Sequence, residues 1–245
     1  MRNIKLTIQY DGTRYNGWQK QTNTPNTIQG KLNDVISSIC NEKIQLIGSG
    51  RTDAGVHAYN QIANFQTDSQ IALESLKDSI NNTLESDICL KKIEEVNDRF
   101  HARYNTTGKK YLYRINNHKD INVFERKYCY HIPEPLDIKK MKTASDYFIG
   151  THDFKAFTSD KRTKKSTIKT IYSIDIRENN GMLEILFHGN SFLYNMVRII
   201  TGTLIEVGQN KMSVSQVREI LECKDRTKAG FTVPPHGLFL KDVLY

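Results

Sequence analysis

The segment from Gly50 to His57 holds the residues best suited to chemistry. It places one carboxylate, Asp53, between Gly50 and Gly55, two positions after the cation Arg51. Glycines let the backbone turn tightly and approach a ligand closely, and a neighbouring guanidinium keeps a carboxylate charged and oriented. Such a carboxylate can act as a nucleophile or as a base. The same pattern also fits a plain turn in which Asp53 hydrogen-bonds its own backbone.

Two further residues, Tyr111 and Arg198, have side chains that could bind a substrate or a charged partner. Tyr111 opens a predicted strand and shares one of its faces with Tyr113, where a ring could stack on an extruded base or simply pack on the sheet. Arg198 ends the largely apolar segment 192–198, where a guanidinium is unfavourable unless a carboxylate or a phosphate pairs with it. Buried arginines serve structure as often as function, so both interpretations stay open.

The elements that must position these residues follow from the hydrophobic pattern. In the first half, alternation at Ile4–Tyr10 predicts a strand, and an apolar stripe behind Thr27 as N-cap predicts a helix. The expected order is a strand at 4–10, a helix at 28–39, strands at 44–47 and 61–65, a helix carrying Leu76, Ile80 and Leu84, and a strand at 88–96.

The second half is expected to repeat this order without visible sequence similarity. It predicts a strand at 111–115, a helix at 138–148, a hairpin of 171–176 and 183–188 around Asn179-Asn180-Gly181, a helix at 192–207, a short helix to about 221 and a strand at 238–243. Ser213 and Gln216 have the spacing of a capping box for the short helix.

Two split β-α-β halves predict an α+β fold with mostly antiparallel sheets, a pseudo-two-fold relation and an active-site cleft between the halves. The polar stretch Asn105–Gly108 predicts the boundary between them. The domains are therefore expected at 1–105, with the Asp53 loop, and at 106–245, with Tyr111 and Arg198.

The composition favours a polyanionic partner. The 245 residues carry a net charge of +8, and a basic run at 161–165 with Lys109 and Lys110 predicts a face that contacts phosphates. A Lys-rich proteome or a merely solvated surface would give the same pattern.

The four cysteines are scattered without close histidines, which disfavours structural zinc and a disulfide framework. No leader and no bilayer-length apolar run is visible, so a cytoplasmic location without membrane contact is expected.

The motifs together resemble the tRNA pseudouridine synthase A family. They keep that family's order over nearly the whole chain: Y-D-G-T-x-Y-x-G-W-Q at Tyr10–Gln19, G-R-T-D-A-G-V-H-A at Gly50–Ala58, F-H-A-R at Phe100–Arg103, K-K-Y-x-Y at Lys109–Tyr113, G-T-H-D-F at Gly150–Phe154, F-L-Y-x-M-V-R at Phe192–Arg198, D-R-x-x-A-G at Asp225–Gly230 and P-P-H-G-L-x-L at Pro234–Leu240.

The resemblance implies an isomerase that converts uridine to pseudouridine at positions 38, 39 and 40 in the anticodon arm of transfer RNA. It puts the catalytic aspartate on Asp53, its arginine partner on Arg198 and the active-site tyrosine, which stacks on the uracil, on Tyr111. Arg51 is expected to help bind the substrate. The reaction needs no cofactor and no metal, and the resemblance also implies a homodimer in which one tRNA contacts both subunits.

Two other functions fit the same residues. One is an RNA-binding module that has lost activity, and the other is a hydrolase of N-glycosidic bonds that uses the same carboxylate. Whether Asp53 attacks C1′ of the ribose, adds to C6 of the base or abstracts the 2′ proton is open at this point, as is the choice of tRNAs.

Overall fold

The computed structural model describes residues 1–160 and 166–245. The basic run at 161–165 lies outside the described residues, so its expected contact with phosphates stays a prediction. All four candidate site residues lie within the described ranges.

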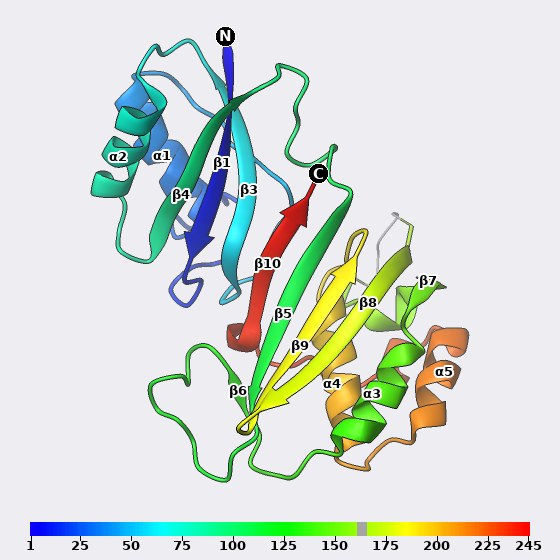
Figure 1. Cartoon of the computed structure of the whole chain (residues 1–245). Coiled ribbons are helices and arrows are strands. Elements are labelled where there is room, and N and C mark those ends of the chain that lie inside the picture. Colours follow the sequence, from blue (N-terminus) through cyan, green and yellow to red (C-terminus); the bar gives the residue numbers. More distant parts are fainter. Residues whose placement is uncertain (161–165) are drawn as a thin grey trace. The chain divides into compact units, whose positions relative to one another are not determined.

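The described residues form two compact units, one built from two stretches of the chain and the other from a single stretch (Figure 1). Unit 1 comprises Met1–Thr107 and Phe239–Tyr245, and unit 2 comprises Gly108–Leu238. The predicted domains, 1–105 with the Asp53 loop and 106–245 with Tyr111 and Arg198, stay a prediction. The division into compact units does not show which residues act together in catalysis.

Unit 1 is a sheet with two helices. Its elements are β1 (Arg2–Tyr10), α1 (Ile28–Cys40), β2 (Ile47–Gly48), β3 (His57–Thr67), α2 (Leu73–Thr83), β4 (Ile88–Val96) and β10 (Leu238–Leu244). The strands follow the order β4-β1-β3-β10, and β2 pairs with β3. β1 is antiparallel to both neighbours, whereas β10 is parallel to β3. The predicted order of strands and helices in the first half is therefore confirmed.

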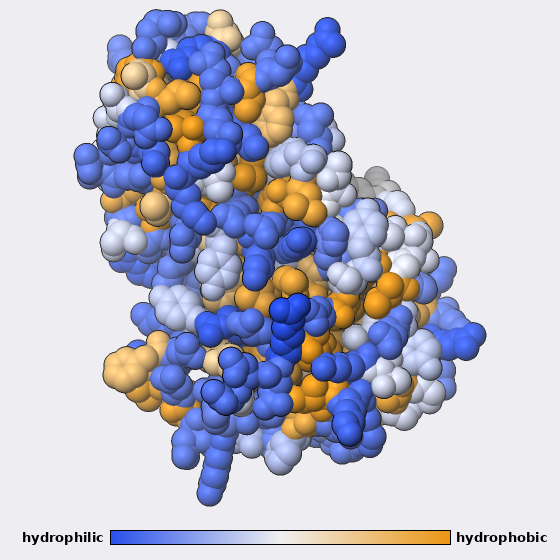
Figure 2. All heavy atoms as spheres, in the orientation of Figure 1, coloured by the Kyte–Doolittle hydropathy of each residue, from blue (hydrophilic) through white to orange (hydrophobic). Residues whose placement is uncertain are grey.

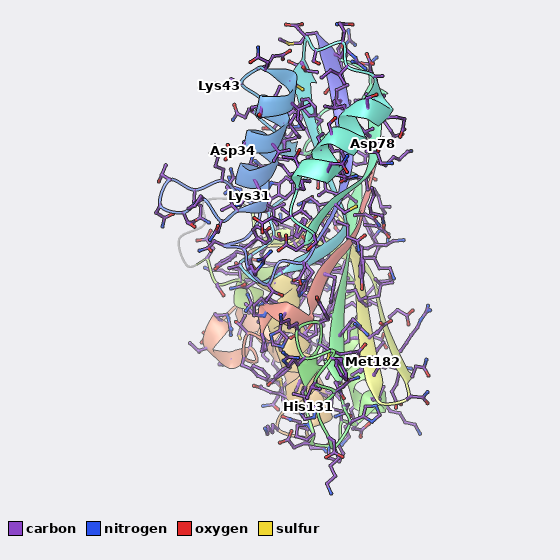
Figure 3. The ribbon with its side chains drawn as sticks, turned by 90° about the vertical axis from the view of Figure 1, so that its left-hand side faces the viewer. Lys31, Asp34, Lys43, Asp78, His131 and Met182 are labelled. Atoms are coloured by element: carbon purple, nitrogen blue, oxygen red, sulfur yellow. The ribbon has the colours of Figure 1, made fainter. Side chains whose placement is uncertain are left out.

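The core of unit 1 forms where the alternating strand meets the helical stripes. Ile4, Leu6 and Ile8 have no exposed surface, since every second residue of β1 points to the same face of the sheet. The helices are amphipathic, and Figure 3 shows Asp34 of α1 and Asp78 of α2 pointing away from the sheet. The predicted N-cap is also present, because the Thr27 side chain accepts a hydrogen bond from the Gly30 N–H at 3.2 Å.

The predicted strand at 44–47 is wrong for most of its length, since β2 contains only Ile47 and Gly48. Side chains of α1 take the backbone hydrogen bonds that a strand would use: Ile44 N–H donates to Ser37 Oγ at 2.9 Å and Leu46 N–H to Asn33 Oδ1 at 3.0 Å. Ile44 and Leu46 are still buried. The apolar residues that suggested a strand therefore pack in the core without pairing in the sheet.

Unit 2 also combines strands with helices. Its main elements are β5 (Gly108–Asn116), β6 (Tyr130–His131), α3 (Ile138–Asp146), β7 (Gly150–Asp153), β8 (Ile168–Asn179), β9 (Met182–Gly189), α4 (Met196–Gly208) and α5 (Val214–Cys223). Short 3-10 turns cover Phe154–Phe157, Arg226–Lys228 and Pro235–Gly237. The strand order is β5-β9-β8-β7, all antiparallel, and β6 runs parallel to β5. The three helices lie on one side of this sheet (Figure 1).

Local signals explain the turns and caps of unit 2. The predicted hairpin joins β8 and β9 through Asn180 and Gly181, both with positive φ, as a tight two-residue hairpin turn requires. The predicted capping box of Ser213 and Gln216 begins α5. The short strands β6 and β7 were not predicted, because they contribute two and four residues to the edges of longer strands.

The predicted start of the helix at Phe192 is wrong, because α4 begins at Met196. Asn195 has a φ of 60°, in the left-handed region, so the right-handed helix cannot extend back through it. Arg198 therefore lies in the first turn of α4 and not in the second turn of a helix that begins at Phe192.

Each unit is thus an α+β arrangement with mostly antiparallel strands, as predicted. The expected two-fold relation and the cleft between the halves stay predictions. Hydrophilic side chains predominate on the face seen in Figure 2. Throughout residues 1–160 and 166–245, every helix is either too short or too polar to cross a lipid bilayer.

Candidate active site

Asp53 begins a tight backbone turn. The Val56 N–H donates to the Asp53 carbonyl at 3.1 Å, and Gly55 at the third position has a φ of 77°. This is the backbone of a type II turn, which favours glycine there because a side chain would clash at positive φ. The backbone of Asp53 does close a turn, as one interpretation of the sequence required, while its half-buried side chain is carried on a fixed frame.

The segment after β1 braces this turn by close backbone contact. The Trp18 N–H donates to the Thr52 carbonyl at 3.0 Å, and the Gly55 N–H donates to the Tyr15 carbonyl at 3.3 Å. A Cβ placed on Gly17 would lie 2.6 Å from the Thr52 oxygen, closer than van der Waals contact allows. The backbone on either side of Asp53 therefore has little room to move.

Side chains beneath the turn complete the support. The Tyr10 hydroxyl and Thr52 Oγ1 are hydrogen-bonded at 2.8 Å in the core. His57 is 1% exposed, accepts a hydrogen bond from the Gly12 N–H at 3.0 Å and stacks on Phe239 with ring centroids 4.7 Å apart. His57 thus belongs to the support of the loop.

Arg51 occupies the outer side of the same loop. Its side chain is exposed, and within the part of the chain that the structure describes it makes no hydrogen bond or ion pair. The backbone beside it is fixed, because Gln61 Nε2 donates to the Gly50 carbonyl at 3.2 Å. The Arg51 guanidinium can therefore meet a phosphate without first breaking an internal ion pair.

Tyr111 and Tyr113 lie on the same face of β5 in different surroundings. Tyr113 is fully buried, and its hydroxyl donates to the Pro234 carbonyl at 2.8 Å. Burial raises the pKa of Tyr113, against a smaller lowering by the charge of Arg198, so its hydroxyl stays neutral. Tyr111 is only half-buried and meets the edge of Phe192, with ring centroids 5.2 Å apart and planes at 82°. Its ring is the one with surface left for a ligand.

Arg198 is held by oxygen atoms on two sides. Its Nη1 donates to Asn195 Oδ1 and its Nε to the Val233 carbonyl, both at 2.8 Å. Asn195 is itself fixed, because its Nδ2 donates to Ser159 Oγ at 3.0 Å. A neutral carbonyl and an amide thus orient the guanidinium, and its expected pairing with a carboxylate stays a prediction.

Comparison with known proteins agrees with the motifs. A family described as tRNA pseudouridine synthase matches residues 6–105 and 144–245. The chain belongs to this family. The enzyme class predicted from the sequence, an isomerase of uridine in tRNA, is thereby confirmed.

Relatives from several bacteria extend over the whole chain. A tRNA pseudouridine synthase A 2 of Bacillus anthracis is 46% identical over 99% of both chains. A tRNA pseudouridine synthase A of Thermoanaerobacter pseudethanolicus is 47% identical, and a tRNA pseudouridine synthase A 1 of Clostridium tetani is 48% identical, each over 100% of both chains.

A solved structure also shows a weak likeness. A chain in the crystal structure of a Cbf5-Nop10-Gar1 complex matches 97% of this chain with a TM-score of 0.39 and 12% identity, and 49% of that chain is covered. This chain thus spans about half the length of that one, and a likeness of this size carries no argument.

The structure distributes the residues expected to act in this family of synthases over both units. It brings Asp53 and Arg51 into one loop of unit 1, and it places Tyr111 and Arg198 in unit 2. The assembly of all four into one site stays a prediction. In the described ranges, no three histidine, cysteine, aspartate or glutamate side chains gather in a way that could hold a metal ion.

The sequence did not reveal how the candidate side chains are held in place. Gly17 and the carbonyl of Val233 support Asp53 and Arg198 through the backbone, which side-chain types do not reveal. Asn195 is the unspecified position x of the motif F-L-Y-x-M-V-R, yet its residue type could have indicated a structural role. Asparagine tolerates the left-handed region and caps helices, so its place just before an apolar helix could have indicated a bend.

Proposed function

We propose that this chain isomerises uridine to pseudouridine at positions 38, 39 and 40 in the anticodon stem-loop of tRNAs, with Asp53 as the catalytic carboxylate. The family and the names of full-length relatives support the reaction and the class of substrate. The positions and the role of Asp53 rest on the resemblance of the motifs and on the geometry of the Asp53 loop.

The observation that carries this proposal is the rigid mounting of Asp53. Its loop is closed by the turn to Val56 and braced from behind by Gly17 and Trp18. A carboxylate that must meet a reacting carbon benefits from a fixed backbone, because misplacement by about 1 Å costs about 100-fold in rate.

The chemistry requires little beyond a positioned carboxylate. The bond from ribose C1′ to uracil N1 breaks, the base turns, C5 bonds to C1′, and the C5 proton leaves as N1 gains one. Asp53 can attack C1′, add to C6 or remove the 2′ proton, and each route uses the same ionised side chain. Atoms and electrons balance without an oxidant or a reductant, so no cofactor is part of the proposal.

The other candidate residues have complementary roles. Arg198 would keep Asp53 ionised and oriented, since a nearby cation favours the charged form of a carboxylate. Tyr111 would stack on the extruded uracil, using the part of its ring that Phe192 leaves uncovered. Arg51 would contact a phosphate beside the target nucleotide.

The proposal includes the setting in which the enzyme works. The resemblance implies a homodimer with one tRNA across both subunits, and we expect it in the cytoplasm, where tRNA is processed. The net charge of +8 supports a polyanionic substrate.

A tritium-release assay on tRNA labelled at C5 of uridine tests this function, because the C5 proton is lost only when the base is rejoined through C5. Release into water with unchanged RNA mass is the expected result. No release above background would refute the synthase, and a loss of mass from the RNA would indicate base hydrolysis instead. Mapping pseudouridine in tRNA from cells with and without the protein tests the positions.

A further inference from the structure

The segment Asn97–Thr107, between β4 and β5, carries an exposed pair of stacked rings. Tyr104 is 77% exposed, yet its ring already lies on that of His101, with centroids 4.1 Å apart and planes at 28°. The ring of Tyr104 is therefore ordered by a neighbour and still open to solvent, so it offers a face on which a base could stack. Arg99 and Arg103 of the same segment are exposed as well.

Hydrogen bonds from the backbone and from the His101 and Asn105 side chains hold this segment without help from the Tyr104 ring. His101 Nδ1 accepts hydrogen bonds from the N–H groups of Arg103 at 3.2 Å and Tyr104 at 3.3 Å. The His101 N–H donates to Asn105 Oδ1 at 2.7 Å, and the Asn105 N–H donates back to the His101 carbonyl at 3.1 Å. The loop therefore presents the ring of Tyr104, and its own closure does not depend on that ring.

The base of the segment is anchored in the core of unit 1. Asn3 Nδ2 donates to the Phe100 carbonyl at 2.9 Å, and the Ala102 N–H donates to Asn64 Oδ1 at 2.9 Å. The segment leaves β4 at the end of unit 1 where the N-terminus lies (Figure 1). An anchored loop loses little entropy when a ligand binds to it.

Its chemistry fits single-stranded nucleic acid. Aromatic rings and guanidinium groups stack on unpaired bases, and arginines pair with phosphates. In this segment the exposed cations Arg99 and Arg103 outnumber the one acid, Asp98. We call His101 and Tyr104, with Arg99 and Arg103, the aromatic platform.

The platform lies far from the Asp53 loop within unit 1. Asn3, which anchors the platform, is at one end of β1, and Tyr10, which bonds Thr52 of the Asp53 loop, is at the other. The distance along the strand is about 23 Å at about 3.3 Å per residue. The platform therefore cannot contact the nucleotide on which Asp53 acts.

We propose that the aromatic platform is a second tRNA contact, on which an unpaired base beyond the anticodon stem-loop stacks on Tyr104 while Arg99 and Arg103 meet neighbouring phosphates. This inference rests on the proposed function, since it takes tRNA as the ligand. It adds a contact that recognises the body of the tRNA and leaves the chemistry at Asp53 unchanged.

Three variants of the full-length protein test the platform by their affinity for an unmodified tRNA transcript. Tyr104→Ala removes the ring and is expected to weaken binding about 10-fold, the range of one lost base stack. Tyr104→Phe keeps the ring and should bind within about two-fold of wild type. The matched control is Tyr172→Ala, because Tyr172 is a 48% exposed tyrosine of unit 2 that also contacts a histidine, His188.

A second ligand, the isolated anticodon stem-loop, tests where the contact lies. Tyr104→Ala should bind it as wild type does, since the platform is expected to act beyond the stem-loop. Circular dichroism melting checks that each variant is folded. Unchanged tRNA affinity in Tyr104→Ala, an equal loss in Tyr172→Ala, or an equal loss with the stem-loop would each overturn the inference.

The outcome separates this inference from the proposed function. If the wild type releases tritium from C5-labelled tRNA and Tyr104→Ala binds tRNA normally, the platform alone is refuted. If the wild type releases no tritium, the proposed function is refuted, whatever the affinity of Tyr104→Ala. At saturating tRNA, Tyr104→Ala should turn over at the wild-type rate, because the platform does not touch the reacting nucleotide.

Discussion

Neighbouring side chains of one strand can serve different purposes, and Tyr111 and Tyr113 illustrate this at the residue scale. The Tyr113 hydroxyl is bonded to a backbone carbonyl in the core, whereas the Tyr111 ring is half-buried and meets the edge of Phe192. Alternation in the sequence assigns both to the same face but does not tell which is covered by the rest of unit 2.

Replacing Tyr111 should separate stacking from packing. We expect Tyr111→Ala to lower kcat/KM by about 10-fold to 100-fold, the worth of a base stack, and Tyr111→Phe to retain most activity because it keeps the ring. Steady-state tritium release measures both. Equal losses in the two variants would contradict stacking and point to the hydroxyl. Tyr113→Phe should instead lower the free energy of unfolding by about 1 kcal/mol, since it leaves the Pro234 carbonyl without its donor.

Asp153 is a residue whose charge serves structure. Its carboxylate accepts from Thr167 Oγ1 at 2.6 Å and from the Lys155 N–H at 3.2 Å, and it pairs with Lys224 Nζ at 2.9 Å. Burial alone would raise the pKa of Asp153, but the hydrogen bonds from Thr167, Lys224 and Lys155 outweigh it and lower the pKa. The ionised form is therefore favoured in the folded protein.

This lowered pKa fixes the sign of a pH effect on stability. The contribution of Asp153 is fully present above the pKa of an unfolded aspartate, about 4, and is lost as the pH falls through the lower folded value. Asp153→Asn should therefore reduce the free energy of unfolding by about 1 kcal/mol at pH 7. The difference from wild type should shrink below about pH 4. Urea titrations across this range measure it, and a difference that grows on acidification would contradict the assignment.

At the scale of elements, the Asp53 loop depends on the chain segment behind it. Gly17 has a φ of 88°, and an added Cβ would meet the Thr52 carbonyl at 2.6 Å. We expect Gly17→Ala to shift the backbone that carries Asp53 and to lower turnover by about 10-fold or more. The strained backbone should also lower the free energy of unfolding by about 1 to 3 kcal/mol.

Gly150→Ala is the matched control for backbone strain. Gly150 also has a positive φ, 108°, but an added Cβ there would meet only His152 Nε2, at 3.4 Å. This variant should lose stability to a similar extent and keep its turnover when assayed well below its melting temperature. If both variants lost turnover equally, the bracing of Asp53 by Gly17 would not be the cause.

The start of α4 is the second element on which the site depends. Asn195 bends the chain in the left-handed region and supplies the Oδ1 that holds Arg198. Asn195→Gly should keep the bend, because glycine adopts positive φ readily, and lose only the side-chain contacts. We expect kcat to fall about 10-fold while the melting temperature and the affinity for tRNA change little.

Two comparisons check that Asn195 acts through Arg198. Asn195→Asp retains the acceptor for Arg198 and should restore most of the rate that Asn195→Gly loses. In an Arg198→Lys background, Asn195→Gly should have little further effect, since residues that act as one unit are not additive. Fully additive losses would show that Asn195 affects the rate by another route.

At the scale of the whole molecule, the order of elements was largely predictable. Alternation at Ile4–Tyr10, the cap at Thr27 and the hairpin at Asn180-Gly181 are local signals that the structure confirms. Each signal depends on a few neighbouring residues, and no distant contact overrides it here. That Asp53 lies in a tight turn was also predictable, because the glycines beside it in the sequence are a local signal.

The features that were not predictable depend on distant contacts. The strand expected at 44–47 is mostly absent because Ser37 and Asn33 of α1 take its hydrogen bonds. The start of α4 depends on Asn195, whose contacts reach Ser159 and Arg198. The bracing of the Asp53 loop by Gly17 is likewise a contact between segments far apart in the sequence.

The role of Asp53 is tested most directly by comparing wild type with Asp53→Asn, in tritium release from C5-labelled tRNA and in tRNA affinity. Asparagine keeps the size of the side chain but cannot act as the ionised carboxylate. We expect release at background for the variant, with a tRNA dissociation constant within a few-fold of wild type. Turnover that survives in Asp53→Asn would show that the Asp53 carboxylate does not carry the reaction.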